Sequence, residues 1–252
     1  MFFNLDGHVA VITGGNGGIG LGMARGLAKA GASVAVWSRN TDKNAAAVAE
    51  LLALGCQAEA FVCDVAREDD VARAMQETLA RFGRVDSCFA NAGVGRAVAF
   101  TEMTVEDWAA VVDVNLVGTF LTFREAVRHM KTRDGGGKLI AVASVGSMHG
   151  MPRQAQYSAS KGGVCSLVRT LAVECARHGI QANTIIPGWI ETEMTEAARS
   201  WDKLRETVVQ RTPARRWGRP EDFEGVAVYL ASKASDFHTG DVLRVDGGYA
   251  IF

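Results

Sequence analysis

Short apolar runs recur along the chain, and longer segments with helical spacing of apolar residues separate them. Runs that are apolar at consecutive positions are typical of strands buried on both faces of a parallel sheet. We expect strands at 8–12, 33–37, 60–63, 87–90, 139–143, 182–186 and 242–245. We expect helices near 18–30, 42–54, 67–82, 104–131, 155–178 and 220–231. This alternation predicts right-handed crossovers and an α/β fold, a single-domain Rossmann-like doubly wound parallel sheet of about seven strands flanked by helices.

Residue types that favour helix ends support these boundaries. Capping side chains stand at expected starts and glycines at expected ends, namely Thr41, Asp42 and Thr104, and Gly31, Gly55 and Gly179. A long region with weak periodicity lies between Pro187 and Pro220, directly after an expected strand. Because ligands bind beyond the carboxyl ends of strands in such sheets, we expect a substrate lid at about 188–219. With no linker, repeat or low-complexity tract, residues 1–252 are expected to form one domain.

Composition narrows the class of partner. The chain has 27 Lys and Arg against 28 Asp and Glu, a formal net charge of -1, which offers no broad field for nucleic acid or an anionic membrane. No run approaches the ~18 to 20 apolar residues of a membrane span, and the start MFFNLDG lacks the parts of a secretory leader. The 5 cysteines include no CxxC pair, which is typical of reduced structural thiols. We therefore expect a cytoplasmic protein with a small-molecule partner.

The stretch TGGNGGIG at 13–20 follows the first expected strand and opens the first expected helix. Such a turn lets backbone N–H groups approach a pyrophosphate, and the helix N-terminus favours the negative charge. The stretch fits two patterns, G-x-G-x-x-G on Gly15, Gly17 and Gly20, and T-G-x-x-x-G-x-G on Thr13, Gly14, Gly18 and Gly20. A tight turn without a ligand is the alternative.

The residues at the end of the second expected strand distinguish between the two glycine patterns and indicate which cofactor binds. The first pattern requires an acidic residue about 20 positions on, to hold a ribose 2′-hydroxyl. The chain has Ser38 there, and Arg39 next to it would meet the 2′-phosphate of NADP. We expect NADP(H), with NAD(H) as the alternative cofactor; the alternative for Arg39 is a solvated surface arginine. Asp64, followed by Val65, is placed either to accept from the adenine amino group or to cap the next helix.

Three possible catalytic residues lie at the end of the fifth expected strand and on the helix expected after it. Ser144 closes the run LIAVAS, and Tyr157 and Lys161 are separated by one helical turn. Positive charge from Lys161 and from an oxidised nicotinamide ring would lower the pKa of Tyr157, which could then exchange a proton with an alcohol or carbonyl oxygen. Ser144 could polarise the same oxygen. Taken singly, each residue is more typical of capping or surface polarity, and it is the spacing of the three that favours a catalytic group.

No metal is expected in this chemistry, because the cofactor carries the hydride. The five histidines show no ligand cluster; they are His8, His129, His149, His178 and His238.

These motifs resemble those of the short-chain dehydrogenase/reductase family, in the subfamily of 3-oxoacyl-[acyl-carrier-protein] reductases and sugar or polyol dehydrogenases. The resemblance covers nearly the whole chain: TGGNGGIG at 13–20, DV at 64–65, NAG at 91–93, VNLVG at 114–118, Ser144, YSASK at 157–161, PGWIET at 187–192, RWGRPEDF at 216–223 and VDGG at 245–248. Two positions depart from the family pattern, Ala90 before NAG and Ala143 before Ser144, and neither removes a catalytic group.

The resemblance implies a role for each matched residue. Tyr157 would be the acid/base, Lys161 would lower its pKa and bind the ribose, and Ser144 would orient the substrate oxygen. Asn115 would hold a water that links Lys161 to solvent. Together with the residues argued from the chain itself, the expected cofactor-binding set is Gly14, Asn16, Gly17, Gly18, Ile19, Gly20, Ser38, Arg39, Asp64, Val65, Asn91, Ala92, Gly93, Tyr157, Lys161, Pro187, Gly188, Ile190 and Thr192.

The family usually forms homotetramers, and this is expected here. The small apolar residues of GGVCSLVRTLAVECA at 162–176 suit a helix that packs against a partner subunit, although a helix buried within one subunit has the same composition.

The expected function is an NADP(H)-dependent oxidoreductase that interconverts a secondary alcohol and a ketone, a carbonyl reductase in the other direction. A 3-oxoacyl-[acyl-carrier-protein] reductase, a sugar-acid or polyol dehydrogenase and a broad ketone reductase stay open, although Lys138 and His178 offer little charge for docking an acyl carrier. The alternative outside enzymes is a non-catalytic dinucleotide sensor. The expected walls of the site are Arg96, Ser147, Met148, His149, Met151, Trp189, Ile190, Met194 and Trp201.

Overall fold

The computed structural model describes residues 2–252, so residue 1 of the expected domain lies outside it. Its strands are β1 (Val9–Thr13), β2 (Ser33–Ser38), β3 (Ala58–Val62), β4 (Ser87–Ala90), β5 (Gly137–Val142), β6 (Ile180–Pro187) and β7 (Val242–Val245). They form one parallel sheet in the order β3-β2-β1-β4-β5-β6-β7. The predicted doubly wound α/β fold is therefore confirmed, with its reversal of strand order between β1 and β4.

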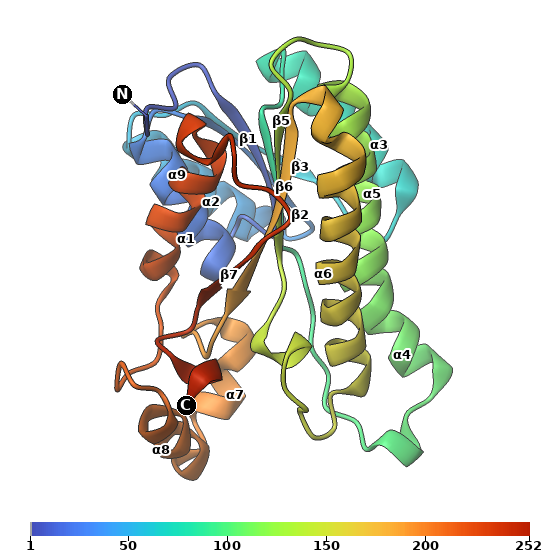
Figure 1. Ribbon diagram of the computed structural model, residues 1–252, viewed down its shortest axis with the longest axis vertical. Coiled ribbons are helices and arrows are strands. Elements are labelled where there is room, and N and C mark those ends of the chain that lie inside the picture. The colour runs from blue at the N-terminus through green and yellow to red at the C-terminus, as the bar shows by residue number, and fades with distance from the viewer. Residues whose placement is uncertain (1) are drawn as a thin grey trace.

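Helices cover both faces of the sheet. They are α1 (Gly18–Lys29), α2 (Thr41–Ala53), α3 (Glu68–Phe82), α4 (Val105–Val112), α5 (Gly118–Met130), α6 (Ala155–Cys175), α7 (Glu196–Arg199), α8 (Asp202–Arg211) and α9 (Glu224–Ala231). Figure 1 shows α1, α2 and α9 on one face and α3, α5 and α6 on the other. Buried apolar side chains fill both layers, such as Met23 and Leu27 of α1 and Phe123 of α5. None of the helices within residues 2–252 is long and apolar enough to cross a membrane.

Three strands begin two residues before the apolar runs from which they were predicted. These are β3, β5 and β6, which begin at Ala58, Gly137 and Ile180. Between β5 and β6 the ladder already pairs Gly137 with Ile180 and Lys138 with Gln181. Parallel pairing uses backbone groups alone, so a strand can begin before the apolar run, at positions that include polar residues.

The helix ends follow the expected signals with one exception. Thr104 forms a capping box with Asp107 at the start of α4, as predicted. At the start of α2, however, Asn40 is the cap, and its side chain accepts from the backbone N–H of Lys43 at 2.9 Å. Thr41 already lies within the helix, because an asparagine one position earlier reaches the same free N–H group.

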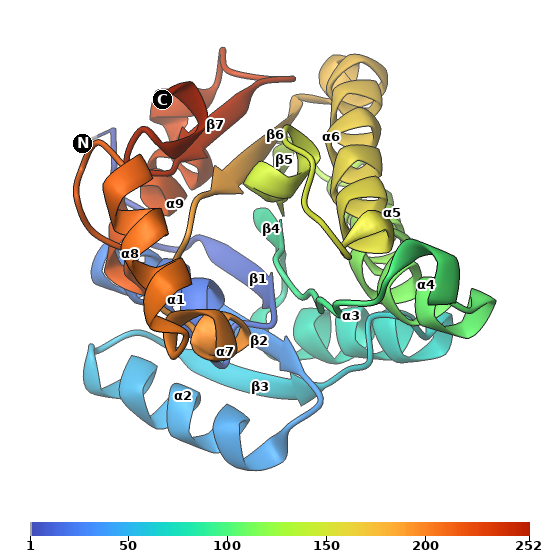
Figure 2. The same ribbon diagram turned by 90° about the horizontal axis from the view of Figure 1, so that it is seen from below.

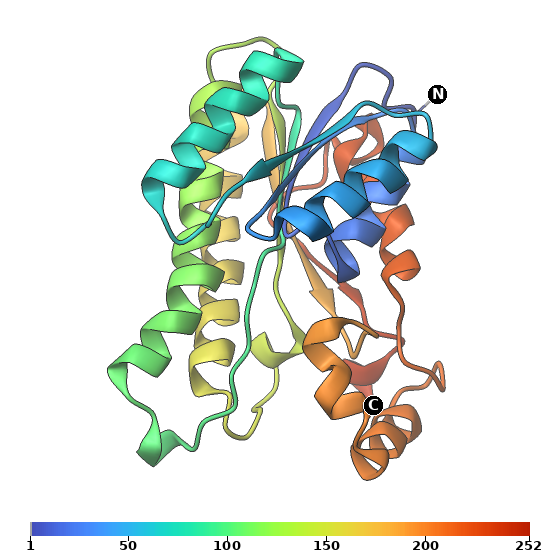
Figure 3. The same cartoon turned by 180° about the vertical axis from the view of Figure 1, so that it is seen from behind.

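The segment that follows β6 lies beyond the carboxyl ends of the strands. Figures 1 and 2 place α7 and α8 there, on the side of α1, and Figure 3 shows the same two helices from behind, near the C-terminus. The C-terminal segment packs on α8, where the guanidinium of Arg211 lies 4.2 Å from the ring centroid of Tyr249. The expected lid region is thus a short helical layer at the edge where ligands bind in such folds.

Candidate active site

The side chains expected to carry the chemistry meet at the carboxyl end of β5. Ser144 follows β5, and Tyr157 and Lys161 lie on successive turns of α6. The Ser144 side chain lies close enough to Tyr157 to lower the pKa of its hydroxyl. A Cβ atom placed on Gly146 would lie 3.5 Å from Ser144 Oγ and 3.4 Å from Tyr157 Cε1. Two hydroxyl groups therefore converge at the end of the sheet where a substrate can reach them.

Lys161 lies under the ring of Tyr157. Its Nζ is 5.9 Å from the ring centroid and donates a 2.8 Å hydrogen bond to the Val142 carbonyl. The predicted one-turn spacing thus brings the two residues together, with the ammonium hydrogen-bonded to the strand end. Lys161 is only 4% exposed, and burial lowers its pKa from 10.5 to about 8.

In the protein alone the pKa of Tyr157 is raised, whereas the predicted lowering included the charge of an oxidised cofactor. Within the protein itself, burial raises the pKa of the Tyr157 hydroxyl, and the nearby Ser144 side chain only partly opposes this. The prediction relied on two positive charges near the hydroxyl. One of them, Lys161, is directed at the Val142 carbonyl, and the other belongs to the oxidised cofactor. The protein alone therefore holds Tyr157 as a neutral acid, the form that can donate a proton to a carbonyl.

Asn115 comes from a π-helical turn, Asp113–Val117, which interrupts the helix predicted at 104–131. The turn aims the Asn115 side chain at the loop after β4. Its Oδ1 accepts from Val94 N at 2.8 Å, and its Nδ2 donates to Val94 O at 3.0 Å and to Ser160 Oγ at 3.1 Å. Single π turns inside helices are frequent at functional sites. The Asn115 amide fixes the loop beside α6, and its role in holding a water stays a prediction.

The backbone at Gly93 passes close to the side chains of Asn115 and Lys161. A Cβ atom on Gly93 would lie 3.2 Å from Asn115 Oδ1 and 3.3 Å from Lys161 Nζ. A larger residue there would push on both polar atoms. The loop that carries the NAG motif therefore passes directly over Asn115 and Lys161, which joins the expected cofactor side of the site to the expected catalytic side.

The glycine-rich turn between β1 and α1 has strict steric demands. Gly18 begins α1 with a φ of +50°, a left-handed conformation that favours glycine. A Cβ atom on Gly20 would lie 2.2 Å from the Gly14 carbonyl oxygen and 2.6 Å from Asn91 Nδ2. No other residue fits at Gly20, because backbone atoms cannot move aside.

The same turn is fastened to the end of β4 through Thr13. The Thr13 hydroxyl accepts from the backbone N–H groups of Asn91 and Ala92, both at 3.0 Å. By contrast, Gly17 has an extended φ of -175° and nothing within 4 Å of an added Cβ. The steric demands thus fall on the T-G-x-x-x-G-x-G residues, whereas the G-x-G-x-x-G pattern includes a position that any residue could fill.

A cavity of 160 Å³ lies beside this turn, at the carboxyl ends of β2 and β3. Its lining includes the predicted residues Gly14, Ser38, Arg39, Asp64, Val65, Ala92 and Gly93. Arg39 is 66% exposed, and its Nη1 lies 3.5 Å from Asp64 Oδ2. Asp64 Oδ1 accepts from Ala66 N at 3.1 Å in a local turn, and the cap of α3 is Arg67, so the alternative of Asp64 as a helix cap is wrong.

Asn16 and Asn44 connect the glycine turn to the end of β2. Asn16 Nδ2 donates to Asn44 Oδ1 at 2.9 Å, and Asn44 Nδ2 donates to the Ser38 carbonyl at 3.1 Å. The loop that carries Asn16 is therefore held next to Ser38 and Arg39. Ile19 is partly buried and packs against the apolar core that includes α1.

The segment after β6 crosses the glycine turn. The γ-methyl of Thr192 would lie 3.1 Å from a Cβ on Gly18. Next to it, Glu193 Oε2 lies 2.5 Å from Lys43 Nζ on α2. Ile190 is buried and pairs with Gly218 in an isolated bridge. These contacts hold the segment after β6 against the glycine turn and against α2, on two sides of the expected cofactor site.

Pro187 and Gly188 determine where that segment leaves the sheet. Pro187 is the last residue of β6, and a Cβ atom on Gly188 would lie 2.7 Å from the Cα of Asp246. The chain can pass this point only with glycine, because the neighbouring atom belongs to the backbone.

The expected walls of the site lie at different depths. Met151 and Ser147 lie close to the reacting groups, since Met151 Sδ would lie 2.7 Å from a Cβ on Gly146 and Ser147 Oγ donates to the Ser144 carbonyl at 2.7 Å. Trp189 packs edge-on against Trp217, with 5.4 Å between the ring centroids. Exposed wall residues are Arg96, Met148, Met194 and Trp201.

Gln154 is close to the site but was not predicted. It is the N-cap residue of α6, yet its side chain makes no capping hydrogen bond. A Cβ atom on Gly95 would lie 3.9 Å from Gln154 Oε1 and 3.7 Å from Tyr157 Cδ2. A glutamine at an expected helix start is an ordinary residue, so only its place three positions before Tyr157 could have drawn attention to it.

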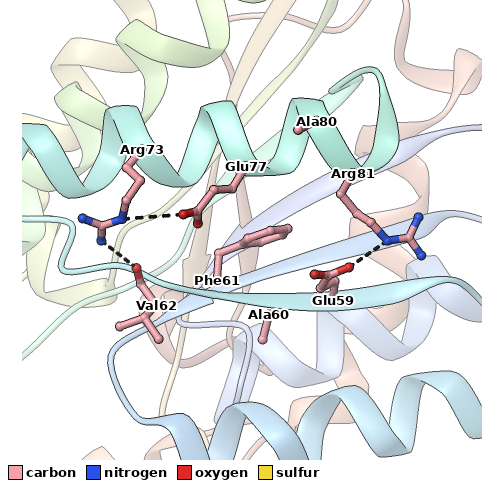
Figure 4. A pocket seen from close by; sticks show the side chains of 8 residues that line it. All are labelled: Glu59, Ala60, Phe61, Val62, Arg73, Glu77, Ala80 and Arg81. Carbon is pink, nitrogen blue, oxygen red and sulfur yellow. Dashed lines mark hydrogen bonds and ion pairs between the residues drawn. The ribbon is translucent and has the colours of Figure 1, made fainter.

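A larger hollow of 640 Å³ lies away from all of these residues, between α3 and the edge strand β3 (Figure 4). Its charged side chains are paired with their neighbours. Arg81 Nε lies 2.7 Å from Glu59 Oε2, and Arg73 Nη2 donates to the Val62 carbonyl at 3.2 Å. These pairs cover the open edge of the sheet with charge, which discourages another strand from pairing there.

Comparison with known protein families gives one match over nearly the whole chain. Residues 14–250 match the family described as enoyl-(acyl carrier protein) reductase.

Two curated relatives illustrate the range of activities among similar chains. The 5-keto-D-gluconate 5-reductase of Escherichia coli (strain K12) is 39% identical over 249 residues, which are 99% of this chain and 98% of the relative. The 3-oxoacyl-[acyl-carrier-protein] reductase of Synechocystis sp. (strain ATCC 27184 / PCC 6803 / Kazusa) is 38% identical over 250 residues, which are 98% of this chain and 99% of the relative.

A solved structure is equally similar. The crystal structure of a gluconate 5-dehydrogenase from Burkholderia cenocepacia J2315, in complex with NADP and tartrate, is 41% identical and superposes with a TM-score of 0.94. The superposition covers 99% of this chain and 98% of that chain.

Proposed function

The chain belongs to the short-chain dehydrogenase/reductase family of oxidoreductases, and we propose that it interconverts a secondary alcohol and a ketone with NADP(H). The observation that carries the proposal is the convergence of Ser144, Tyr157 and Lys161 at the carboxyl end of β5, next to the glycine turn. A non-catalytic dinucleotide sensor would not need two neighbouring hydroxyl groups or a buried lysine at this place, since function follows the site and not the fold.

The residues around the glycine turn suit a dinucleotide. The start of α1 offers N–H groups at Gly18, and the close approach at Gly20 keeps the backbone low enough for a pyrophosphate to lie on it. The 160 Å³ cavity beside the turn would receive the adenosine end, with Asp64 at its border. When bound, NADPH would supply the hydride that becomes the new C–H bond of the alcohol.

In the proposed reduction, the protein supplies the proton. Tyr157 donates its hydroxyl proton to the carbonyl oxygen as that oxygen gains negative charge, and Ser144 donates a hydrogen bond to the same oxygen. Lys161, with a pKa of about 8, is mostly charged at pH 7, and together with the positive charge of the oxidised cofactor it would stabilise the phenolate that remains on Tyr157. In the oxidation direction, the same phenolate accepts the alcohol proton.

We place the 2′-phosphate of NADP at Ser38 and Arg39. The neutral serine ends β2, and the exposed guanidinium beside it can form charge-assisted hydrogen bonds to phosphate oxygens. Two structures similar to this chain support the choice, the gluconate 5-dehydrogenase bound to NADP and a gluconate 5-dehydrogenase from Beutenbergia cavernae with bound NADP at 38% identity.

For the substrate, we propose a sugar acid of the gluconate type. Relatives named as gluconate or keto-gluconate enzymes support this class, and tartrate, the ligand in the structure from Burkholderia cenocepacia, is itself a hydroxylated acid. The 3-oxoacyl thioester is the second candidate, because reductases of that class are equally similar in sequence. Lys138 and His178 do not help that candidate. They lie at the amino ends of β5 and β6, opposite the site, and Lys138 is paired with Asp236 at 2.7 Å.

A substrate panel tests the proposed activity. Purified protein is mixed with NADPH and with 5-keto-D-gluconate, an acetoacetyl thioester or a cyclic ketone, and the nicotinamide absorbance is followed. We expect turnover of 5-keto-D-gluconate with the highest kcat/KM. A preference for the thioester would favour the second candidate, and no turnover of any carbonyl would contradict the proposed activity.

We also propose that residues 188–219 act as a lid over the cofactor and substrate. The contacts of Thr192 with Gly18 and of Glu193 with Lys43 support this, because they join the segment to both flanks of the cofactor site by groups that can separate. An exposed ion pair is weak enough to open during turnover.

A homotetramer is proposed as the assembly. Apolar side chains are exposed on the α4 and α6 surfaces, including Val105, Trp108 and Val173, and a second copy of the chain would cover them. Sedimentation of the purified protein gives the number of subunits directly.

The five cysteines are free thiols in the structure, which supports the proposal that the protein works in a reducing compartment.

A further inference from the structure

Several unpartnered polar atoms belong to residues close to Tyr157 in the sequence. Among the side chains of residues 2–252, seven buried nitrogen or oxygen atoms have no hydrogen-bond partner, and four of them belong to residues 149–158. These four are His149 Nε2, Gln154 Oε1, Gln156 Oε1 and Ser158 Oγ. Buried polar groups in proteins nearly always have a partner, so such a concentration indicates where a ligand completes the hydrogen bonding.

Gln154 is the residue of this group whose side chain is free to serve a ligand. It caps α6 through its backbone, because its carbonyl accepts from Ser158 N at 2.9 Å and its N–H donates to Met151 O at 3.2 Å. Its side chain takes no part in the cap. Gln156, by comparison, already donates its amide to the Arg96 carbonyl at 2.8 Å. The Gln154 side chain is therefore not needed to start the helix.

The backbone on the other side of Gln154 is also held in place. Arg153 has a φ of +64°, a left-handed conformation that costs energy in a residue other than glycine. The Arg153 carbonyl accepts from Val98 N at 2.9 Å, which joins this segment to the loop after β4. A strained residue persists only when its surroundings determine its conformation, so the position of Gln154 is defined before any ligand arrives.

The Gln154 amide and one edge of the Tyr157 ring adjoin the same position, Gly95. The Gly95 position adjoins both the amide oxygen, at 3.9 Å from an added Cβ, and Tyr157 Cδ2, at 3.7 Å, and Gly95 itself is exposed. The opposite edge, at Cε1, faces Gly146 and the sulfur of Met151. One edge of the ring thus adjoins an exposed glycine that also neighbours the Gln154 amide, while the other edge adjoins the position that the Met151 side chain fills.

We propose that Gln154 determines substrate specificity by pairing its side-chain amide with a hydroxyl of a polyhydroxylated substrate. The inference rests on the proposed function, since it assigns a neighbour to the carbon chain that extends from the carbonyl held by Ser144 and Tyr157. An amide offers both donors and an acceptor, and a hydroxyl can satisfy either. A substrate without hydroxyls leaves the amide unpaired, and sites built for a hydroxyl discriminate strongly against analogues that lack it.

The test compares two substrates that share a carbon chain. 5-Keto-D-gluconate and 5-oxohexanoate both carry a carboxylate at carbon 1 and a ketone at carbon 5, and only the first carries hydroxyls. Steady-state reduction of each by NADPH is measured for the wild type, Gln154→Leu and Gln181→Leu. Gln181 is the matched control, because its amide donates to the Gly179 carbonyl at the far end of β6.

The expected result is a change in discrimination. Gln154→Leu should lose roughly 10- to 100-fold in kcat/KM for 5-keto-D-gluconate, mostly through KM, with kcat/KM for 5-oxohexanoate unchanged. Gln154→Asn, which keeps an amide, should recover part of the loss, and Gln181→Leu should match the wild type. An unchanged urea midpoint confirms that the Gln154→Leu protein is folded.

Other outcomes would contradict either the role of Gln154 or the proposed function. Equal losses for both compounds would assign Gln154 a structural role, and no loss for 5-keto-D-gluconate would remove it from the substrate site. A wild type that reduces 5-oxohexanoate as well as 5-keto-D-gluconate would show that hydroxyls are not recognised. A wild type that reduces no carbonyl would instead contradict the proposed function.

Discussion

Replacing Lys161 with methionine is expected to stabilise the protein at neutral pH. Lys161 is 4% exposed, and its pKa falls from 10.5 to about 8 on folding. This difference means that the folded chain holds a buried ammonium at a cost of about 3 kcal/mol at pH 7. Methionine has a similar shape without the charge, but it gives up the 2.8 Å hydrogen bond to the Val142 carbonyl, about 1 kcal/mol. The net gain in the free energy of unfolding is about 2 kcal/mol.

The same reasoning predicts how this gain depends on pH. Between about pH 8 and 10.5 the unfolded wild type keeps the Lys161 proton while the folded protein has lost it. Unfolding then takes up a proton, so the stability of the wild type rises with pH in this window relative to the variant. Below pH 8 the advantage of Lys161→Met should be complete. Near pH 10.5 it should vanish, leaving only the cost of the lost hydrogen bond.

Urea unfolding at fixed protein concentration, followed by tryptophan fluorescence at pH 7, 8, 9 and 10, measures both effects. Lys233→Met is the control, because Lys233 is exposed and its replacement should leave the unfolding free energy unchanged at every pH. A Lys161→Met protein that is less stable than the wild type at pH 7 would refute the reasoning, as would a difference that does not vary with pH.

Three further changes test the cofactor side of the site. Arg39→Asp should shift the ratio of kcat/KM for NADPH over NADH toward NADH by about 10- to 100-fold, since a carboxylate would replace the cation proposed to meet the 2′-phosphate; an unchanged ratio would remove Arg39 from that role. Gly20→Ala forces a Cβ to within 2.2 Å of a backbone oxygen and should lower the urea-derived free energy of unfolding by about 1 to 3 kcal/mol, whereas Gly17→Ala, with nothing within 4 Å, should show no comparable loss. Glu193→Gln breaks an exposed ion pair with Lys43, worth about 1 kcal/mol or less, so stopped-flow should show NADPH dissociating up to about 5-fold faster; identical rates at low salt would contradict a role in holding the lid.

The fold could be predicted because buried parallel strands need consecutive apolar side chains, and the chain supplies seven such runs. The starts of the strands were less well predicted, since pairing at Lys138 and Gln181 depends only on the backbone. The π turn around Asn115 was also not predicted. One extra residue in a turn barely alters the periodicity of a long amphipathic segment, so 104–131 resembled a single helix.

For the site, properties set by residues close together in the sequence could be predicted, whereas properties set by tertiary packing could not. The one-turn spacing of Tyr157 and Lys161 is local, and the structure brings the two residues together. The pKa of Tyr157 depends on how deeply tertiary packing buries the ring: in the protein alone burial raises this pKa, and its lowering by Lys161 together with an oxidised cofactor stays a prediction. Gln154 was missed for the same reason, because its proximity to Gly95 arises from two segments that are distant in sequence.

The most direct test of the proposed chemistry is Tyr157→Phe, measured for NADPH binding and for turnover of 5-keto-D-gluconate in the same preparation. Tyr229→Phe is the matched control, because the Tyr229 hydroxyl hydrogen-bonds to His238 outside the candidate site. Removing the Tyr157 hydroxyl should lower kcat by about 10²- to 10⁴-fold while NADPH titration by fluorescence stays close to the wild type. Retention of wild-type kcat by Tyr157→Phe would contradict the assignment of Tyr157 as the acid/base, and with it the account of this site.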